Sequence, residues 1–195
     1  MPIPFWVPSL WVAASLLAWP QTIWLTILGY HALCLIGSAQ RGVWRSGQSI
    51  RIGWIVAGLS LLLLAIPFAL PPLSGFPHAA ISSALSQWPG GLRGQAAYAL
   101  LVNVPVEEAY WRGALIRQHP DWSPVQHGAA FGLHHAIAAA VMLPWPWLVP
   151  AFVGPAIAGV LWAWLAKRTG GIAFPVLGHA IADLSLLVLA ALQLS

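Results

Sequence analysis

The sequence predicts an all-α fold: a polytopic transmembrane helix bundle with about seven spans, within a range of six to eight. Hydrophobic residues make up 59% of the 195 residues and charged residues only 6%, whereas soluble domains carry about 25% charged residues. Apolar segments that approach the roughly 20 residues needed to cross a bilayer recur along the chain. This composition excludes a soluble enzyme and a disordered linker, and the length predicts a single transmembrane domain over residues 1–195.

Seven apolar segments are the predicted spans, and proline or glycine marks most of the breaks between them. The first two segments could also form one long, kinked helix over residues 5–38. The mixed stretch 73–92 allows a short interfacial helix. The predicted breaks include Pro20-Gln21, Pro71-Pro72, Pro120-Asp121, Pro144-Trp145-Pro146 and Gly170-Gly171. The predicted spans are 5–19, 21–38, 52–70, 94–117, 123–142, 147–166 and 172–193.

The basic residues predict how the chain is oriented. If the spans alternate in direction, only Arg93 lies on one side of the membrane, and the other basic residues share the opposite side. Such an asymmetry indicates that the shared side is cytoplasmic. A net charge of +4 without a basic stripe does not indicate nucleic acid, so the predicted partner is the lipid bilayer. The residues on the shared side are Arg41, Arg45, Arg51, Arg112, Arg117, Lys167 and Arg168.

Ionisable residues inside the spans are the main functional signal. Three of the four acidic residues fall there, although each costs at least ~2.5–3.5 kcal/mol on insertion scales and marks a functional site by default. At 1.5 Å per residue, the polar groups on three spans lie about 12–18 Å from the predicted cytoplasmic ends. This common depth predicts one buried polar cavity that opens towards the cytoplasm. The residues are Glu107 and Glu108 in the fourth span, His134 and His135 in the fifth, and His179 and Asp183 in the seventh.

Spacing assigns different surroundings to the two glutamates. Glu108 and Arg112 are four residues apart and share a helix face, so they can form an ion pair. Glu107 is rotated from that face by about 100°. Its separation from the ion pair suits a general base. His179 and Asp183 are also four residues apart and place a histidine and a carboxylate on one face.

Three short motifs carry a family resemblance. EEAYWR at 107–112 matches EExxxR, FGLHH at 131–135 matches FxxxH, and HAIAD at 179–183 matches Hxxx(N/D). In this order and on separate apolar spans, they resemble the motifs of the CAAX-protease and bacteriocin-processing family of intramembrane proteases. Prenyl endopeptidases of the Ras-converting type belong to that family. The resemblance covers residues 105–183.

The resemblance implies an endopeptidase that hydrolyses a peptide bond near the C-terminus of a membrane-associated or lipidated substrate, without a cofactor. By matching position, Glu107 would activate the water as general base and His135 would hold it. His179 and Asp183 would stabilise the oxyanion. The remaining motif residues would order the site or contact the peptide substrate: Glu108, Arg112 and Phe131.

The roles of Asp183 and of the two neighbouring histidines, His134 and His135, follow less directly from the motifs. The family often has Asn where this chain has Asp183, and an ionised Asp cannot donate a hydrogen bond to an oxyanion. Asp183 would therefore be protonated or would orient His179, and the orienting role is favoured. The FxxxH spacing selects His135, so His134 is predicted to be packed or hydrogen-bonded to water.

Several alternatives stay open at this point. Glu107, His135 and His179 could bind zinc, although HExxH is absent and the resemblance favours a metal-free mechanism. The polar pairs could instead hold helices together in a non-catalytic scaffold or a bacteriocin-immunity factor. A proton-coupled transporter would also bury such groups. A protease that removes C-terminal sorting tails is a further candidate within the same family. The predicted location is multi-pass in a bacterial inner membrane, with the site open to the cytoplasmic side.

Overall fold

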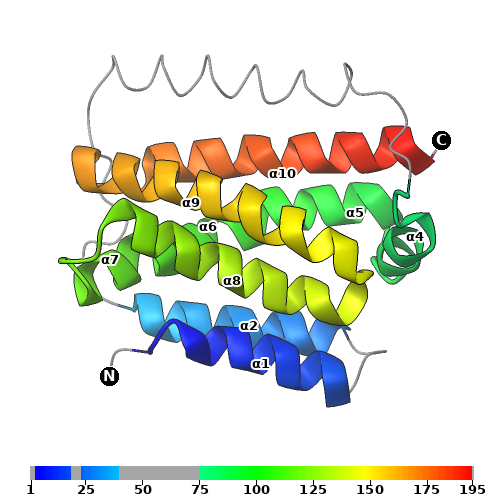
Figure 1. The fold of residues 1–195 in the computed structure, drawn as a ribbon, viewed down its shortest axis with the longest axis horizontal. Coiled ribbons are helices and arrows are strands. Elements are labelled where there is room, and N and C mark those ends of the chain that lie inside the picture. Colours follow the sequence, from blue (N-terminus) through cyan, green and yellow to red (C-terminus); the bar gives the residue numbers. More distant parts are fainter. Residues whose placement is uncertain (1–2, 19–22, 40–74, 195) are drawn as a thin grey trace. The chain divides into compact units, whose positions relative to one another are not determined.

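The computed structural model describes residues 3–18, 23–39 and 75–194, and every regular element in these ranges is helical (Figure 1). The all-α prediction is therefore confirmed for this part of the chain. Several predicted features lie outside the described residues: the span 52–70, the breaks at Pro20-Gln21 and Pro71-Pro72, and Arg41, Arg45 and Arg51.

The helices follow the other six predicted segments closely, and the mixed stretch contains a short helix. Their bounds agree with the predicted ones to within about three residues, which is close to the usual uncertainty of helix ends. In chain order they are α1 (Trp6–Ala18), α2 (Ile23–Ser38), α4 (His78–Ser86), α5 (Gly91–Tyr98), η1 (Ala99–Asn103), α6 (Val104–Glu108), η2 (Ala109–Ala114), α7 (Leu115–Gln118), α8 (Pro124–Met142), η3 (Trp145–Trp147), α9 (Leu148–Thr169) and α10 (Ala173–Leu194).

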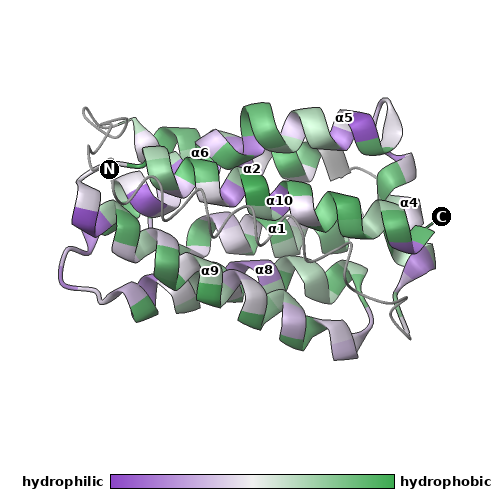
Figure 2. Cartoon of the chain, turned by 90° about the horizontal axis from the view of Figure 1, so that it is seen from above, coloured by the Kyte–Doolittle hydropathy of each residue, from purple (hydrophilic) through white to green (hydrophobic). Residues whose placement is uncertain are grey.

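Two of the described helices are long and apolar enough to cross a membrane, namely Trp145–Thr169 and Ala173–Leu194. Shorter apolar helices cover Trp6–Ala18 and Leu25–Ser38. Hydrophobic residues occupy most of the length of the described helices when they are coloured by hydropathy (Figure 2). The count of seven spans stays a prediction.

The burial pattern of α2 is inverted relative to a helix of a soluble protein. Leu28 and Ile36 are 63% and 62% exposed, whereas Thr26, Tyr30 and His31 are buried. Polar side chains thus face the protein interior and large apolar ones face outwards. Because soluble proteins place large aliphatic residues inside, this arrangement is typical of a helix whose outer face contacts lipid.

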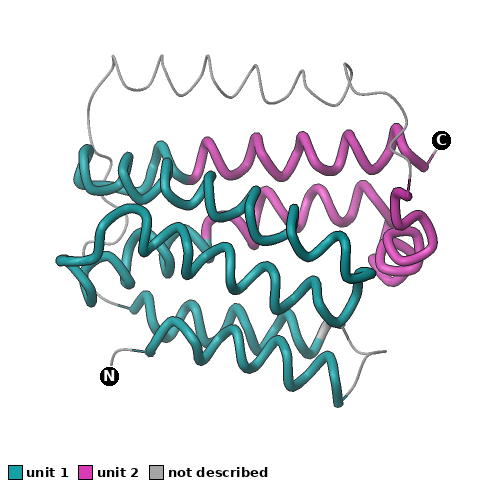
Figure 3. The backbone as a smooth tube through the Cα atoms, in the orientation of Figure 1, with its two compact units in different colours: residues 1–47, 106–175 teal, residues 48–105, 176–195 magenta. Residues whose placement is uncertain are grey.

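The chain forms two compact units (Figure 3). Unit 1 comprises residues 1–47 and 106–175, and unit 2 comprises residues 48–105 and 176–195. In unit 1, α8 packs along α9, α1 packs on α2 and α8, and η2 contacts α2 and α9. Unit 2 contains α4, α5, η1 and most of α10. In that unit the imidazole of His78 lies 2.9 Å from the carbonyl oxygen of Gln193.

Glycines in α8 allow its close contact with α9. A Cβ atom added at Gly128 would lie 2.5 Å from the carbonyl oxygen of Ala156, and one at Gly132 would lie 2.6 Å from that of Phe152. No side chain fits at such distances, so these positions set the separation of the two helices. Small residues at helix contacts are common in membrane bundles, because they let the backbones approach.

Local signals fix the start of α8. Ser123 is the N-cap, and its side chain and that of Gln126 form a reciprocal capping box. Pro124 occupies the first helical turn, where its missing N–H leaves no hydrogen bond unmade. Lys167 of α9 donates to the carbonyl oxygens of Pro120 and Trp122 in the preceding loop. These contacts hold the turn between α7 and α8 against α9.

The helical stretch 91–118 is less regular than its hydropathy predicts. Two π-helical segments, η1 and η2, lie on either side of α6, which contains Glu107 and Glu108. Pro105 lacks the N–H that would bond to a carbonyl in the preceding turn, and a missing bond of this kind is a recognised cause of helix irregularity. π-Helical turns occur frequently at functional sites. The two glutamates therefore lie in the most irregular part of the described chain.

Candidate active site

Glu108 and Arg112 form the ion pair that their spacing predicts. Arg112 Nη1 lies 2.9 Å from Glu108 Oε1, and the two side chains are 2% and 0% exposed. The pair connects α6 to η2, and it forms although Arg112 lies in a π-helical segment. Removing only one partner of such a pair would leave an uncompensated charge among apolar helices.

Aromatic rings complete the surroundings of Arg112. Its guanidinium lies 4.0 Å from the ring centroid of Phe131 in α8 and 5.0 Å from that of Trp162 in α9. These distances are within the range of cation–π attraction. Phe131, the first residue of the FxxxH motif, therefore contacts the arginine of the EExxxR motif. The contact joins the first two motifs within unit 1.

Glu107 is buried, with an exposure of 4%, and it accepts a hydrogen bond from a helix far away in the sequence. The hydroxyl of Tyr30 in α2 donates to Glu107 Oε1 over 2.8 Å. Trp111 Nε1 donates in turn to the hydroxyl of Tyr30 over 3.1 Å. Nothing in the spacing of the motif predicts the tyrosine contact, because the two residues are 77 positions apart.

His134 also belongs to this network, as a packed and hydrogen-bonded residue. Its ring stacks on that of Tyr30, with centroids 4.8 Å apart and an interplanar angle of 15°. Its Nδ1 lies 3.1 Å from Ser9 Oγ of α1. The sequence prediction of a packed His134 is therefore correct, and its hydrogen-bonding partner is a serine.

His135 lies on a different face of α8 and is partly exposed. Its Nδ1 is 3.0 Å from the carbonyl oxygen of Phe131. A carbonyl only accepts hydrogen bonds, so in the neutral ring this contact places the proton on Nδ1 and leaves Nε2 as an acceptor. A histidine in that form can accept a hydrogen bond from a water molecule.

His179 and Asp183 lie in α10 within unit 2. His179 Nε2 is 3.4 Å from Asp183 Oδ1, as the four-residue spacing predicts. His179 is 3% exposed, and the side chain of Asp183 is 22% exposed. That this pair lies near Glu107 and His135 stays a prediction, which rests on the order of the three motifs in the sequence.

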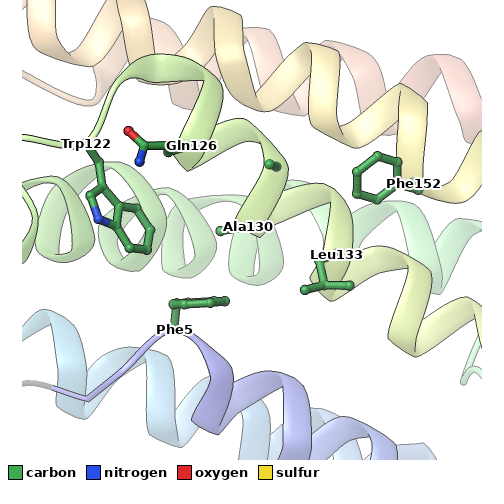
Figure 4. A pocket seen from close by; sticks show the side chains of 7 residues that line it. Phe5, Trp122, Gln126, Ala130, Leu133 and Phe152 are labelled. Carbon is green, nitrogen blue, oxygen red and sulfur yellow. The ribbon is translucent and has the colours of Figure 1, made fainter.

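A pocket of about 430 Å3 lies elsewhere in unit 1. Trp122 lies at one end of it and Phe152 at the other (Figure 4). None of its lining side chains is ionisable, so the pocket contributes no acid or base. The lining residues are Phe5, Trp122, Gln126, Ala129, Ala130, Leu133 and Phe152.

Potential metal ligands show no grouping in the described ranges. Among residues 3–18, 23–39 and 75–194, no three His, Cys, Asp or Glu side chains are gathered in a way that could hold a metal ion. Glu107, His135 and His179 stay the predicted ligands in the zinc alternative.

The fold and the site together define an all-α protein with membrane-type helices and a buried cluster of ionisable side chains. Residues 89–185 match the family model described as type II CAAX prenyl endopeptidase Rce1-like. This segment of the chain belongs to the Rce1-like family, and the resemblance predicted from the three motifs is confirmed. The family is one of membrane-embedded proteases. No curated protein and no solved structure matches the chain.

Proposed function

We propose that the protein is a CAAX-type intramembrane endopeptidase that uses a water molecule activated by Glu107. The supporting observation is the position of Glu107 in unit 1. It is buried next to an ion pair that already engages the neighbouring glutamate, and it lies within the segment that matches the protease family. Glu108 pairs with Arg112, and Glu107 is the carboxylate that transfers protons in this proposal.

The proposed reaction needs no external reagent besides water. Glu107 accepts a proton from the water while the water oxygen attacks the carbonyl carbon of the scissile peptide bond. The C–N bond of the tetrahedral intermediate then breaks, and Glu107 returns the proton to the departing amine. A water-poor site strengthens each of these electrostatic interactions.

The other motif residues have supporting roles in this proposal. His135, with Nε2 as an acceptor, holds the attacking water. His179 donates to the developing oxyanion, and Asp183 orients His179 rather than contacting the oxyanion itself. Arg112 and Glu108, with Phe131 stacked on the guanidinium, maintain the position of α6 relative to α8 and α9.

The proposed substrate is a peptide or protein whose C-terminus is associated with the membrane or carries a lipid. The cleaved bond lies near that C-terminus, and the site opens towards the cytoplasmic side of a bacterial inner membrane. A protease for C-terminal sorting tails is the alternative within the same family. It would act on the same bond type in a different class of substrate.

One observation also supports a second function, that of a non-catalytic scaffold or an immunity factor. The Glu108–Arg112 pair, packed between Phe131 and Trp162, is also what a non-catalytic scaffold or an immunity factor would need to join its helices. Glu107 distinguishes the two functions. Glutamine keeps the size of the side chain and can still accept the hydrogen bond from Tyr30, so a scaffold should keep its phenotype in Glu107→Gln, whereas a protease should lose it.

The experiment is a comparison of membrane peptides by mass spectrometry. Wild type, Glu107→Ala and Glu107→Gln are co-expressed with a library of candidate membrane peptides, and the C-termini are compared. Asp121→Asn is the matched control, because Asp121 is an exposed acid in the loop after α7. New C-termini with wild type and Asp121→Asn, and none with the monodisperse Glu107 variants, are expected. Identical peptides from all four proteins would contradict the proposal.

The zinc alternative is tested with the same products. Purified wild type is treated with a zinc chelator, and cleavage is then compared with and without added zinc. A metal-free glutamate mechanism predicts an unchanged rate. Loss of cleavage that zinc restores would assign a metal to the site and overturn the metal-free mechanism.

A further inference from the structure

Tyr30 contacts the candidate active site from a helix outside the family match. It lies in α2, whereas the match covers residues 89–185. The side chain is 5% exposed, and its hydroxyl both donates and accepts hydrogen bonds. It donates to Glu107 Oε1 over 2.8 Å and accepts from Trp111 Nε1 over 3.1 Å. Both roles of the hydroxyl, donor and acceptor, are therefore engaged.

Close packing holds α2 in place against η2. A Cβ atom added at Gly37 would lie 2.8 Å from Cε2 of Tyr110, so a larger residue there would displace the ring or the helix. The hydroxyl of Tyr110 also donates to the carbonyl oxygen of Ile3 over 3.1 Å. These contacts bring the N-terminal segment and α2 onto η2, which follows Glu107 along the chain.

The ring of Tyr30 is restrained as well as its hydroxyl. His134 of α8 stacks on it at 4.8 Å, and Ser9 of α1 contacts His134 at 3.1 Å. The chain of contacts therefore runs from α1 through α8 and α2 to Glu107. A phenol restrained on its ring face and at its hydroxyl can act as a fixed donor.

We propose that Tyr30 is a positioning residue for Glu107. Its hydroxyl holds Oε1 of the carboxylate in one orientation, and Trp111 and His134 hold Tyr30. The N-terminal helices α1 and α2 are then part of the functional centre, although they lie outside the matched segment. This inference rests on the proposed function of Glu107 as general base.

Tyr30→Phe removes only the hydroxyl and is the test variant. Hydrogen bonds to charged groups are among the strongest in proteins, so kcat should fall roughly 10- to 100-fold. KM should stay within about twofold, because the lost contact is to the base and not to the substrate. Tyr110→Phe is the matched control. This variant also removes a buried phenol hydroxyl in unit 1. That hydroxyl donates to the carbonyl oxygen of Ile3 and not to Glu107, so kcat should be unchanged.

A spectroscopic measurement tests the contact without cleavage. The chain contains only four Asp and Glu residues, so an infrared difference spectrum between wild type and Glu107→Gln isolates the carboxyl band of Glu107. The same difference, recorded in the Tyr30→Phe background, should show that band at a shifted frequency. The Tyr110→Phe background should leave the band in place. Trp111→Phe, which keeps Tyr30, should shift it in the same direction by a smaller amount.

The outcomes separate the two proposals. A lower kcat and a shifted band in monodisperse Tyr30→Phe support the positioning role. An unchanged kcat and an unmoved band would overturn it, and so would an equal effect of Tyr110→Phe on both readouts. If wild type cleaves nothing while the band still shifts, the proposed proteolysis fails and the positioning contact stands. If Tyr30→Phe is not monodisperse, an unmoved band in Trp111→Phe overturns the inference.

Discussion

At the scale of single residues, the two neighbouring glutamates occupy different surroundings. Glu108 lies against the guanidinium of Arg112, and Glu107 accepts a hydrogen bond from the phenol of Tyr30. In the proposed mechanism, Glu108 maintains the structure through Arg112 while Glu107 exchanges protons. The assignment of roles to Glu107 and Glu108 rests on this difference.

The buried pair leads to a stability prediction for Arg112. Arg112→Ala leaves Glu108 at 0% side-chain exposure without its cation, and breaking a buried pair on one side costs about 3–5 kcal/mol. The variant should unfold at a markedly lower temperature in detergent. Arg112→Lys should fall between it and wild type, because lysine keeps the charge but loses the planar stacking on Phe131.

Arg168→Ala is the control for this measurement. Arg168 lies in the last turn of α9 and is exposed, so its loss should change the unfolding temperature little. Equal stabilities of Arg112→Ala and Arg168→Ala would contradict the assignment of the Glu108–Arg112 pair as a structural contact.

Residue pairs differ in how well the sequence predicts them. Glu108–Arg112 and His179–Asp183 follow from a spacing of four within a helix, and the structure contains both. The contact of Tyr30 with Glu107 depends on how two helices pack, and no periodicity in the sequence encodes it. Tyr30 lies next to His31 in an apolar segment, and this position does not tell which residue its hydroxyl contacts.

At the scale of helices, most boundaries follow from local chemistry. Ser123, Pro124 and Gln126 start α8 as a capping box with proline in the first turn, and Gly170 ends α9 with a positive φ of 70°. Such signals can be read along the chain. The π-helical segments η1 and η2 differ from the prediction, because hydropathy does not distinguish a π-helical turn from an α-helical one.

The contact of α8 with α9 gives a prediction at this scale. Gly132→Ala places a Cβ atom 2.6 Å from a backbone oxygen of α9, so the helices must separate. Overpacking of this kind costs about 1–3 kcal/mol. Thermal unfolding in detergent should show the loss, and Gly128→Ala should behave alike.

Gly154 supplies the matched control within α9. A Cβ atom there would meet nothing within 4 Å, and alanine is the better helix former by about 0.5–1 kcal/mol. Gly154→Ala should therefore be neutral or stabilising. If Gly132→Ala and Gly154→Ala changed the unfolding temperature equally, close packing of α8 on α9 would not be what determines stability here.

At the scale of the whole molecule, apolar side chains on the outside of α2 and ionisable ones inside agree with a membrane protein. The family match supports the same environment. Composition alone predicts this class, because 6% charged residues cannot solvate a protein surface. Span number and orientation depend on the chain as a whole, and they require a topology measurement.

The proposed orientation predicts which loops can be labelled from each side. In a Cys34→Ala background, Gln118→Cys lies at the end of α7 and should react with an impermeant thiol reagent only after cells are opened. Trp145→Cys, in the exposed turn between α8 and α9, should react in intact cells. Labelling of residue 118 in intact cells would contradict a cytoplasmic opening of the site.

The most direct test of the central claim is the cleavage rate of purified Glu107→Gln on the substrate that the peptide comparison identifies. Glutamine keeps the size of the side chain and can still accept the hydrogen bond from Tyr30, but it cannot take a proton from water. We predict that kcat falls by about 10²–10⁴-fold, the range of general-base catalysis, with unfolding temperature near that of wild type. Cleavage by folded Glu107→Gln at the wild-type rate would contradict the claim that Glu107 activates the water.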